Sequence, residues 1–327
     1  MRKPRLILLH GIVAAAAAVA LALPAAAAFP DGPIEFVIPF GAGDGADIEG
    51  RVLADEMGKV LGVPVVPINK PGAGGAVTYT YVKNAKPDGK TIAWNSTSIL
   101  TTTNIGNVDF EHSALDHIGQ VEYQSMPFAV RADAPWKTMK DFAADCKKSP
   151  GKYKIANSTT GSATHLAAIA IASAVGCEVI HLPVGVKRRN ATVLSGEADA
   201  MVAPLTGAIK LAEAAKIRLL AIPSPKRNPV IPDVPTMKEQ GFDAELLLFR
   251  GLSVPKGTPK DVKAKLADAM TKAAHSKAFK DLAAKNGFTI ETLGVEEFEK
   301  VLTAEDRRVK AIMKAAGLYQ SEKGKKQ

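Results

Sequence analysis

The chain contains few of the residues from which metal, cofactor and nucleic-acid sites are built. Its 327 residues include two cysteines and six histidines, and no pair of histidines has the His-x-x-x-His or His-Glu-x-x-His spacing of a zinc site. Two cysteines alone cannot form a structural zinc site with four ligands. Aromatic residues make up 6% of the sequence and do not alternate with a basic stripe, which argues against nucleic acid as a partner. We therefore expect no metal ion, no cofactor and no nucleic acid.

Long apolar runs are also scarce, and only the N-terminus has one without charge. Basic residues within positions 2–5 precede an uncharged apolar run at 11–24, and alanines follow up to Ala28. This order is typical of a cleaved secretory signal, and the run is short for a membrane span, which needs about 20 residues. We predict a signal peptide over residues 1–28, cleaved near Ala28, and a periplasmic mature protein. A buried alanine-rich helix or an uncleaved anchor is the alternative.

Acidic residues are fewer than basic ones, but the imbalance is small. The chain has 42 Lys and Arg against 33 Asp and Glu, a formal charge of +9, and loss of the three N-terminal cations leaves 39 against 33. A mildly basic exterior favours encounter with anions. A basic cluster at 323–326 lies in the C-terminal tail, which we expect to be frayed and solvated.

The two cysteines, Cys146 and Cys177, lie near the ends of predicted helices that flank one strand. Export to an oxidising compartment makes a disulfide possible. A disulfide also requires that the Cα atoms approach within about 7 Å, which the sequence does not tell us. Bonded and free cysteines therefore both remain open.

Short apolar runs alternate with longer segments of helical period along the rest of the chain. We predict strands at 34–40, 64–69, 91–95, 126–131, 153–158, 178–183, 199–203 and 218–224, with helices between them that include 139–147, 163–175, 191–195 and 208–215. This alternation predicts an α/β fold with mostly parallel sheets and helices on both faces.

A glycine-rich loop at 41–47, GAGDGAD, joins the first predicted strand to a helix. Glycines permit close backbone approach, and the free N–H groups at a helix start can bind an anion. Glycines at every second position do not have the G-x-G-x-x-G spacing of a dinucleotide site. The loop therefore indicates an anion site, with a plain turn as the alternative. A second glycine-rich run at 70–75 is better explained as a turn than as a ligand wall.

A loop rich in hydroxyl groups follows another predicted strand, at 158–165, and opens into a helix. It could hold a carboxylate from the side opposite the first loop. It lacks the G-x-S-x-G pattern of a hydrolase nucleophile, and Ser162 is too close in sequence to His165 for the usual nucleophile and base pair. We expect His165 to be structural and the protein not to be an enzyme, with a periplasmic α/β hydrolase as the rival hypothesis.

Two groups of cations could face a cleft. Arg250 lies between an apolar run and a second β-rich segment, and an arginine there could hold a carboxylate through two hydrogen bonds; a surface arginine is the alternative. Residues 187–189, Lys-Arg-Arg, could line the cleft mouth, but a solvated helix start is the interpretation we favour.

Several stretches match a known family in order and spacing. They are PIEFVIPFGAGDGADIEGRVLADEM (33–57), VVPINKPGAGGAVTYTYVKNAKPDG (65–89), GSATHLAAIAIASAVG (161–176), LSGEADAMVAP (194–204), PVIPDVPTMKEQGF (229–242) and RGLSVPKGTP (250–259). The match as a whole extends over nearly all of the mature chain. The sequence resembles the extracytoplasmic receptors of tripartite tricarboxylate transporters, the Bug/TctC family.

The resemblance implies a two-lobed periplasmic-binding-protein (Venus flytrap) fold, with lobe 1 at 29–125 plus 252–327 and lobe 2 at 126–251. It implies capture of a small di- or tricarboxylate between the lobes, largely by backbone amides and waters, and delivery to membrane subunits of the transporter. An aromatic carboxylate, or a sensing receptor for signalling, is the alternative.

The resemblance also implies which residues meet the ligand. They are Phe40, Gly41, Ala42, Gly43 and Asp44 in the first loop, Asn95, Ser96 and Thr97 after a strand, Ser158, Gly161, Ser162, Thr164 and His165 in the second loop, and Ala203 and Arg250. Ala203 stands where many members have an aspartate, which argues against an amino-acid ligand. Asp44 replaces a frequent glycine and opposes an anion, unless it caps the helix or meets a ligand donor.

Overall fold

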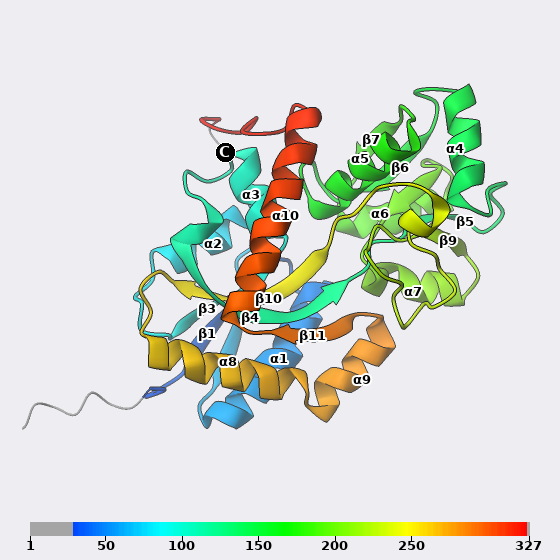
Figure 1. Cartoon of the computed structure of the whole chain (residues 1–327). Helices are drawn as coiled ribbons and strands as arrows, with labels where there is room; N and C mark the ends of the chain where they lie inside the picture. Colours follow the sequence, from blue (N-terminus) through cyan, green and yellow to red (C-terminus); the bar gives the residue numbers. More distant parts are fainter. Residues whose placement is uncertain (1–28, 326–327) are drawn as a thin grey trace, which may run out of the picture.

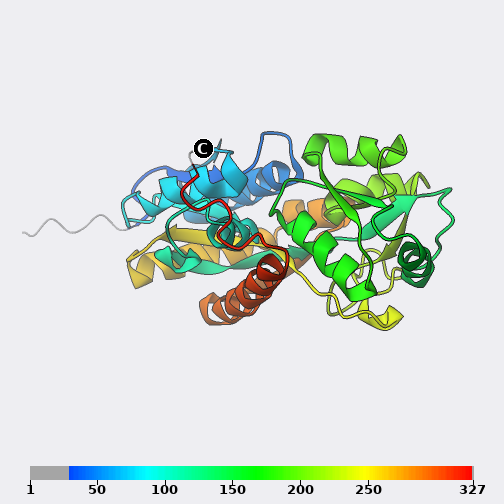
Figure 2. The same ribbon diagram turned by 90° about the horizontal axis from the view of Figure 1, so that it is seen from above.

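The computed structural model describes residues 29–325, and the predicted signal peptide lies outside these residues. Two sheets, each flanked by helices, form two lobes that lie side by side (Figures 1 and 2). The predicted two-lobed α/β fold is confirmed. Among the described helices, none combines the length and the apolar character needed to cross a bilayer.

The sheet of the first lobe has six strands: β1 (Ile34–Ile38), β2 (Val65–Asn69), β3 (Thr91–Ser96), β4 (Leu115–Gln124), β10 (Leu248–Pro255) and β11 (Thr289–Leu293). Their order in the sheet is β11-β4-β10-β3-β1-β2. β1 pairs in parallel with β2 and β3, whereas β10 is antiparallel to β3 and β4. β11 is antiparallel to β4, so the sheet is mixed.

The sheet of the second lobe has five strands: β5 (Phe128–Arg131), β6 (Lys154–Asn157), β7 (Ile180–Pro183), β8 (Ala200–Val202) and β9 (Ile217–Ala221). Their order is β7-β6-β8-β5-β9. β6 is parallel to β7 and β8, and β5 is antiparallel to β8 and β9. β5 and β10, the strands by which the chain enters each lobe from the other, are antiparallel to their neighbours. The prediction of mostly parallel sheets did not include these antiparallel pairs.

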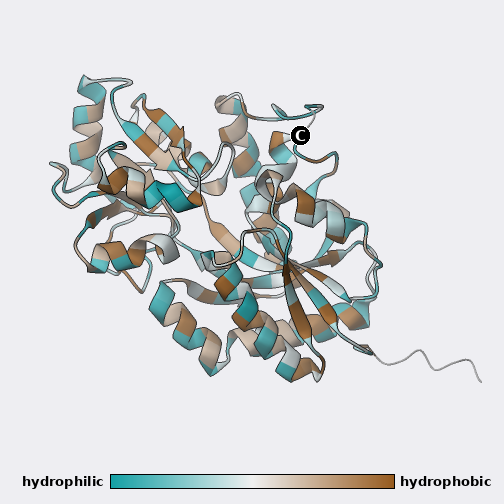
Figure 3. Ribbon diagram, turned by 180° about the vertical axis from the view of Figure 1, so that it is seen from behind, coloured by the Kyte–Doolittle hydropathy of each residue, from teal (hydrophilic) through white to brown (hydrophobic). Residues whose placement is uncertain are grey.

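Ten α-helices flank the described part of the sheets, and hydrophilic and hydrophobic residues alternate along several of them (Figure 3). The first lobe has α1 (Gly45–Leu61), α2 (Ala76–Lys83), α3 (Ser98–Ile105), α8 (Lys260–Ala274), α9 (Lys277–Asn286) and α10 (Val295–Ala315); the second has α4 (Met139–Lys148), α5 (Ala163–Val175), α6 (Val186–Leu194) and α7 (Leu205–Glu213). Short 3₁₀ turns occur at Ala73–Gly75, His112–Ala114 and Lys238–Gln240.

The chain crosses between the lobes twice, after β4 and before β10. The first crossing occupies residues 125–127, and the second lies within residues 222–247. Residues 248–251 pair with β3 and β4 of the first sheet, so we propose to assign them to lobe 1 rather than to lobe 2.

Tight packing between β1 and α1 fixes the start of α1. At Gly50, an added Cβ would lie only 3.1–3.2 Å from atoms of Trp94, Ile38 and Phe36, so glycine lets the helix approach the sheet closely. Trp94 is fully buried, and its indole N–H donates to the Ala46 carbonyl over 3.0 Å. The first turn of α1 is therefore held in place by the core of the lobe.

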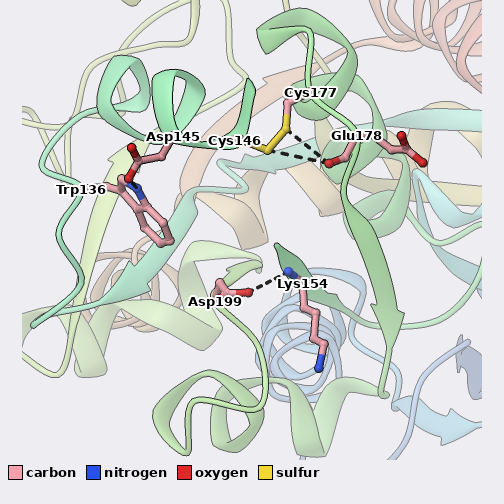
Figure 4. Close-up of a disulfide and its surroundings, with 7 residues drawn as sticks. All are labelled: Trp136, Asp145, Cys146, Lys154, Cys177, Glu178 and Asp199. Carbon is pink, nitrogen blue, oxygen red and sulfur yellow. Dashed lines mark hydrogen bonds between the residues drawn. A yellow bond between two sulfur atoms is a disulfide. The ribbon is translucent and has the colours of Figure 1, made fainter. Parts of the chain in front are cut away.

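A disulfide joins Cys146 and Cys177 in the second lobe, with the Cα atoms 5.8 Å apart (Figure 4). It links the last turn of α4 to the segment after α5, where Gly176 ends the helix in the left-handed region at a φ of 67°. Both sulfurs lie near the Glu178 carbonyl. The structure thus answers the question that the sequence left open.

Replacing both cysteines with alanine should lower the free energy of unfolding by about 3–4 kcal/mol, because the bond restricts the unfolded chain across 31 residues. Urea unfolding of the double variant and of the oxidised parent would measure this difference. An unchanged unfolding midpoint would mean that the cross-link contributes nothing to stability.

Candidate functional site

A cavity of about 830 Å³ lies between the lobes, and both lobes contribute to its wall. From the first lobe the wall includes Pro39, Phe40, Asp44, Gly45, Ala46, residues 72–75, Ser96, Ser98, Thr101, Thr102, Ile105, Asn107, Leu248, Arg250 and Glu322; from the second it includes residues 158–164, Val186, Arg189, Pro204, Thr206 and Gly207. The two loops that sequence analysis singled out therefore share one hollow.

The Asp47 carboxylate holds the first loop, between β1 and α1, in one conformation. Asp47 accepts hydrogen bonds from the Gly43 N–H over 2.9 Å, from Arg51 over 2.9 Å and from Asn69 over 2.8 Å. Burial acts to raise the pKa of Asp47, but these donors outweigh it and hold the pKa below its usual value. The amides of Gly45 and Ala46, in the first turn of α1, have no partner within the helix. They lie at the wall and can donate to an anion.

The second loop, between β6 and α5, uses many of its own donors internally. The Ser158 N–H donates to Thr164 Oγ1 over 3.0 Å, and the Gly161 N–H donates to His165 Nδ1 over 3.0 Å. Ser162 is the N-cap of α5, and its side chain accepts from the His165 N–H. The loop is therefore rigid, and the donors it can offer a ligand come from the first turn of α5 and from hydroxyl groups.

His165 serves this loop rather than the cavity. It is buried, its ring packs edge-on against His181 at 5.0 Å, and it does not line the wall. Burial, with the neighbouring His181, lowers the pKa of His165 to about 4. The neutral ring can then accept from Gly161 throughout the physiological range of pH.

Arg250 reaches the cavity from β10, but the carboxylates that it contacts belong to the protein. Its Nε lies 2.6 Å from Glu49 and 3.3 Å from Glu122, and both glutamates are fully buried. Its guanidinium also lies over the Phe40 ring, 5.5 Å from the centroid. Contact between Arg250 and a ligand remains a prediction.

The two glutamates share this cation unequally. Burial raises the pKa of Glu49, against the effect of Arg250. Burial, reinforced by the charge of Glu49, raises the pKa of Glu122 well above its usual value. We therefore assign the charge that balances Arg250 to Glu49 and the retained proton to Glu122. Gln124 donates to both carboxyl groups and accepts from Thr206 of the second lobe over 3.2 Å.

Arg189, on α6, is a buried cation of the second lobe. It is 2% exposed, and its guanidinium donates to Ser158 Oγ over 2.8 Å. Among residues 29–325 no acidic side chain forms an ion pair with it, and its Nε has no hydrogen-bond partner. Burial lowers the pKa of Arg189 to about 10, which leaves it charged at neutral pH, and the charge of Asp44 acts in the opposite direction.

Eight of the predicted contact residues line the cavity, and seven do not. Those at the wall are Phe40, Asp44, Ser96, Ser158, Gly161, Ser162, Thr164 and Arg250; those away from it are Gly41, Ala42, Gly43, Asn95, Thr97, His165 and Ala203. Asn95 donates to Ser253 inside the first lobe. The Thr97 hydroxyl donates to the Leu247 carbonyl just before β10 and accepts from the Phe249 N–H within it. Ala203 is fully buried in the core of the second lobe.

Asp44 is the N-cap residue of α1 by position, but its side chain makes no capping hydrogen bond. Of the two explanations offered for a carboxylate at this place, capping is therefore excluded. A hydrogen-bond donor on the ligand stays as a prediction.

Four parts of the wall were missed or misjudged from the sequence. The glycine run at 72–75 forms a 3₁₀ turn and also lines the cavity. The start of α3 contributes Ser98, Thr101 and Thr102. Arg189 is buried, so a solvated helix start was wrong for it, although Arg188 beside it is exposed and paired with Glu197.

The fourth part is the segment that ends at Glu322, for which sequence analysis made no prediction. It runs from α10 across α3 (Figures 1 and 2), where Gln320 N–H donates to the Asn104 carbonyl and Glu322 N–H to the Ile105 carbonyl. Glu322 reaches the cavity wall. Short backbone bonds to a neighbouring helix end fix this segment, a signal that no sequence pattern carries. Residues 323–325 after it are exposed, as expected for the solvated basic tail, and residue 326 lies outside the described residues.

The described residues hold no group of three or more His, Cys, Asp or Glu side chains arranged for a metal ion. Ser253 Oγ lies 2.8 Å from His117 Nδ1, but both residues are buried inside the first lobe and neither lines the cavity. A serine and histidine pair in that position has no access to a substrate.

Known proteins with the same architecture place the chain in a family. The family model for the tripartite tricarboxylate transporter family receptor, TctC, matches residues 50–318. A UPF0065 protein of Cupriavidus necator is 32% identical over 98% of this chain and all of its own length. The structure of the periplasmic binding protein BugD is 30% identical, covers 89% of this chain and 99% of its own, and superposes with a TM-score of 0.78.

A TctC solute-binding protein from Polaromonas, crystallised without ligand, is also 30% identical, with a TM-score of 0.76 over 88% of this chain and 99% of its own. These solved relatives are solute-binding receptors rather than enzymes, and the family is periplasmic. This chain therefore belongs to the TctC family, the receptors of tripartite tricarboxylate transporters.

Proposed function

We propose that this protein captures a small carboxylate between its lobes in the periplasm and delivers it to the membrane subunits of a tripartite tricarboxylate transporter. The observation that carries the proposal is that the first turns of α1 and α5, from different lobes, line the same cavity. Each helix start presents unpaired N–H groups and a partial positive charge. An anion that touches both gains hydrogen bonds from two lobes at once.

This geometry links binding to motion. A hydrogen bond to a charged group contributes about 1.5–3 kcal/mol, and the full set forms only when the lobes are closed around the ligand. A carboxylate therefore shifts the population toward the closed form. The transporter subunits can recognise that form, which is how a soluble receptor would signal that it is loaded. Cleavage near Ala28 would release the receptor into the periplasm.

Two classes of ligand are compatible with this proposal. The family resemblance favours a di- or tricarboxylate, and an aromatic carboxylate is the alternative. Both present at least one carboxylate to the helix starts. A sensing receptor would use the same cavity, and membrane subunits encoded beside the receptor would favour transport.

A thermal-shift screen tests the carboxylate proposal directly. Mono-, di- and tricarboxylates, amino acids and sugars would each be added to the purified mature protein, and the unfolding midpoint measured. We expect carboxylates to raise the midpoint, since a ligand at 100 times its Kd stabilises the fold by about 2.7 kcal/mol. Stabilisation by sugars or amino acids alone would contradict the proposal.

A further inference from the structure

The cavity wall carries few charged groups, and they differ in whether the protein itself balances their charge. Its described charged residues are Asp44, Arg189, Arg250 and Glu322. Arg250 is in contact with Glu49 at 2.6 Å, so its charge is already balanced by the protein. Arg189 is the wall cation that forms no ion pair within residues 29–325, although the charge of Asp44 acts on it without such a contact.

Burial and a hydrogen bond also fix the conformation of the Arg189 side chain, so it does not extend into solvent. Its side chain is buried in the second lobe, and its guanidinium is anchored to Ser158 of the hydroxyl-rich loop. An added Cβ at Gly207 would lie 3.2 Å from one guanidinium nitrogen, so the small residue makes room for the group. A buried arginine of this kind costs stability unless an anion pairs with it.

Resting on the proposed function, we infer that Arg189 anchors the ligand's carboxylate in the second lobe, and that the ligand carries one carboxylate with an uncharged remainder. Arg189 presents a planar donor group that matches a carboxylate. Ser158 holds its orientation, and the first turn of α5 lies beside it.

The remaining charges of the wall argue against a second carboxylate on the ligand. Asp44 and Glu322 both reach the cavity. Within residues 29–325 Asp44 forms no ion pair, whereas Glu322 pairs with the exposed Lys325 over 3.0 Å. Asp44 would therefore repel a second anion at close range, and Glu322 adds no cation to attract one. The Phe40 ring and the side chains of Ile105 and Leu248 supply apolar surface instead. An uncharged body that carries a hydroxyl group could also donate to Asp44.

Variants of neighbouring arginines separate this role from a general effect of charge. Arg189→Met removes the buried cation, Arg189→Lys keeps a charge with different geometry, and Arg188→Met removes the exposed cation one residue away, whose side chain is 69% exposed. Without ligand, Arg189→Met should raise the unfolding midpoint by about 2–4 °C, since an unpaired buried charge is lost. Arg188→Met should leave it within about 1 °C. A lowered midpoint for Arg189→Met would show a structural residue and overturn the inference.

Matched probes test the ligand class. Benzoate and terephthalate, and pentanoate and glutarate, differ within each pair by a second carboxylate, and each is titrated into the wild type and the three variants by calorimetry. We expect the monocarboxylate of a pair to bind the wild type more tightly, with at least ten-fold loss in Arg189→Met, a smaller loss in Arg189→Lys and none in Arg188→Met. Preference for the dicarboxylates, or equal binding by Arg189→Met, would overturn the inference while leaving carboxylate capture intact. If no carboxylate of the wider screen binds the wild type, the proposed function itself fails.

Discussion

Gly161→Val should weaken carboxylate binding by about ten-fold or more. Gly161 lies in the second-lobe loop, and an added Cβ there would meet the Cδ1 of Ile105, on α3 of the first lobe, at 2.4 Å. Ile105 is buried and β-branched, so its side chain can give way only by a change of rotamer or by a shift into the cavity that it lines. The loop and α3 could then no longer approach as closely as they do here. A loss of about 1.4 kcal/mol in the closed form corresponds to a ten-fold loss of affinity.

The control must separate this contact from backbone strain. Gly161 has a φ of +72°, where a β-branched residue is disfavoured. Gly151, also in the second lobe, has a φ of +71° and nothing within 4 Å of an added Cβ. Gly151→Val should therefore reduce stability by a similar amount but leave affinity unchanged.

A compensating variant makes the test sharper. Ile105→Ala removes the atoms that a new side chain at position 161 would meet, so the double variant should recover most of the lost affinity. Calorimetry with the tightest carboxylate of the screen measures binding, and small-angle scattering measures whether the lobes close. If Gly161→Val and Gly151→Val bind equally well, contact between this loop and α3 does not control closure.

The sequence predicted those elements whose pattern is local. The run at 163–175 was predicted as a helix and is one, because its apolar residues, its N-cap Ser162 and the glycine after Val175 all agree. β1, β2 and β3 were found because β-rich runs are bounded by glycine or proline. These same elements position the two loops, which is why the loops could be placed at one cavity before the structure was known.

β4 was missed because its pattern is not that of a buried strand. Its sequence, LDHIGQVEYQ, contains His117, Gln120, Glu122 and Gln124, all of which are buried. Polar residues are buried when partners from distant segments satisfy them, and Glu122 has its partners in Glu49 and Arg250. Glu49 is 73 residues from Glu122 in the sequence and Arg250 is 128 residues from it. Sequence alone does not reveal contacts between residues so far apart.

Arg189 was misjudged because the phase of its helix was unknown. α6 begins at Val186 rather than at residue 191, and Arg189, Thr192 and Val193 then share the buried face. Residues 187–189 are all cations, and only the position of each around the helix axis shows which one lies on the buried face. The four-residue spacing from Arg189 to the apolar Val193 was the available signal.

Removal of the cation between the two buried glutamates should have the other large effect. Arg250→Met should destabilise the fold by about 3–5 kcal/mol at pH 8, because the fully buried carboxylate of Glu49 would lose its counter-charge beside the buried carboxyl group of Glu122. Lys277→Met provides the exposed comparison: its pair with Asp281 has side chains that are 87% and 64% exposed, and its loss should change stability by less than about 0.5 kcal/mol. Urea unfolding of both variants would measure the contrast.

The pH dependence identifies the cause of that loss. Glu49 and Glu122 already have pKa values above their usual ones, and without Arg250, which lowers both, the values rise further. A carboxyl group whose pKa is raised by folding retains its proton in the folded state after the unfolded chain has released it, so stability falls as pH rises above the ordinary value of about 4.5. Arg250→Met should therefore cost little near pH 4.5 and most near pH 8, and adding Glu49→Gln should recover part of the loss at pH 8. A destabilisation that is equal at both pH values would assign the role of Arg250 to packing against Phe40 rather than to charge.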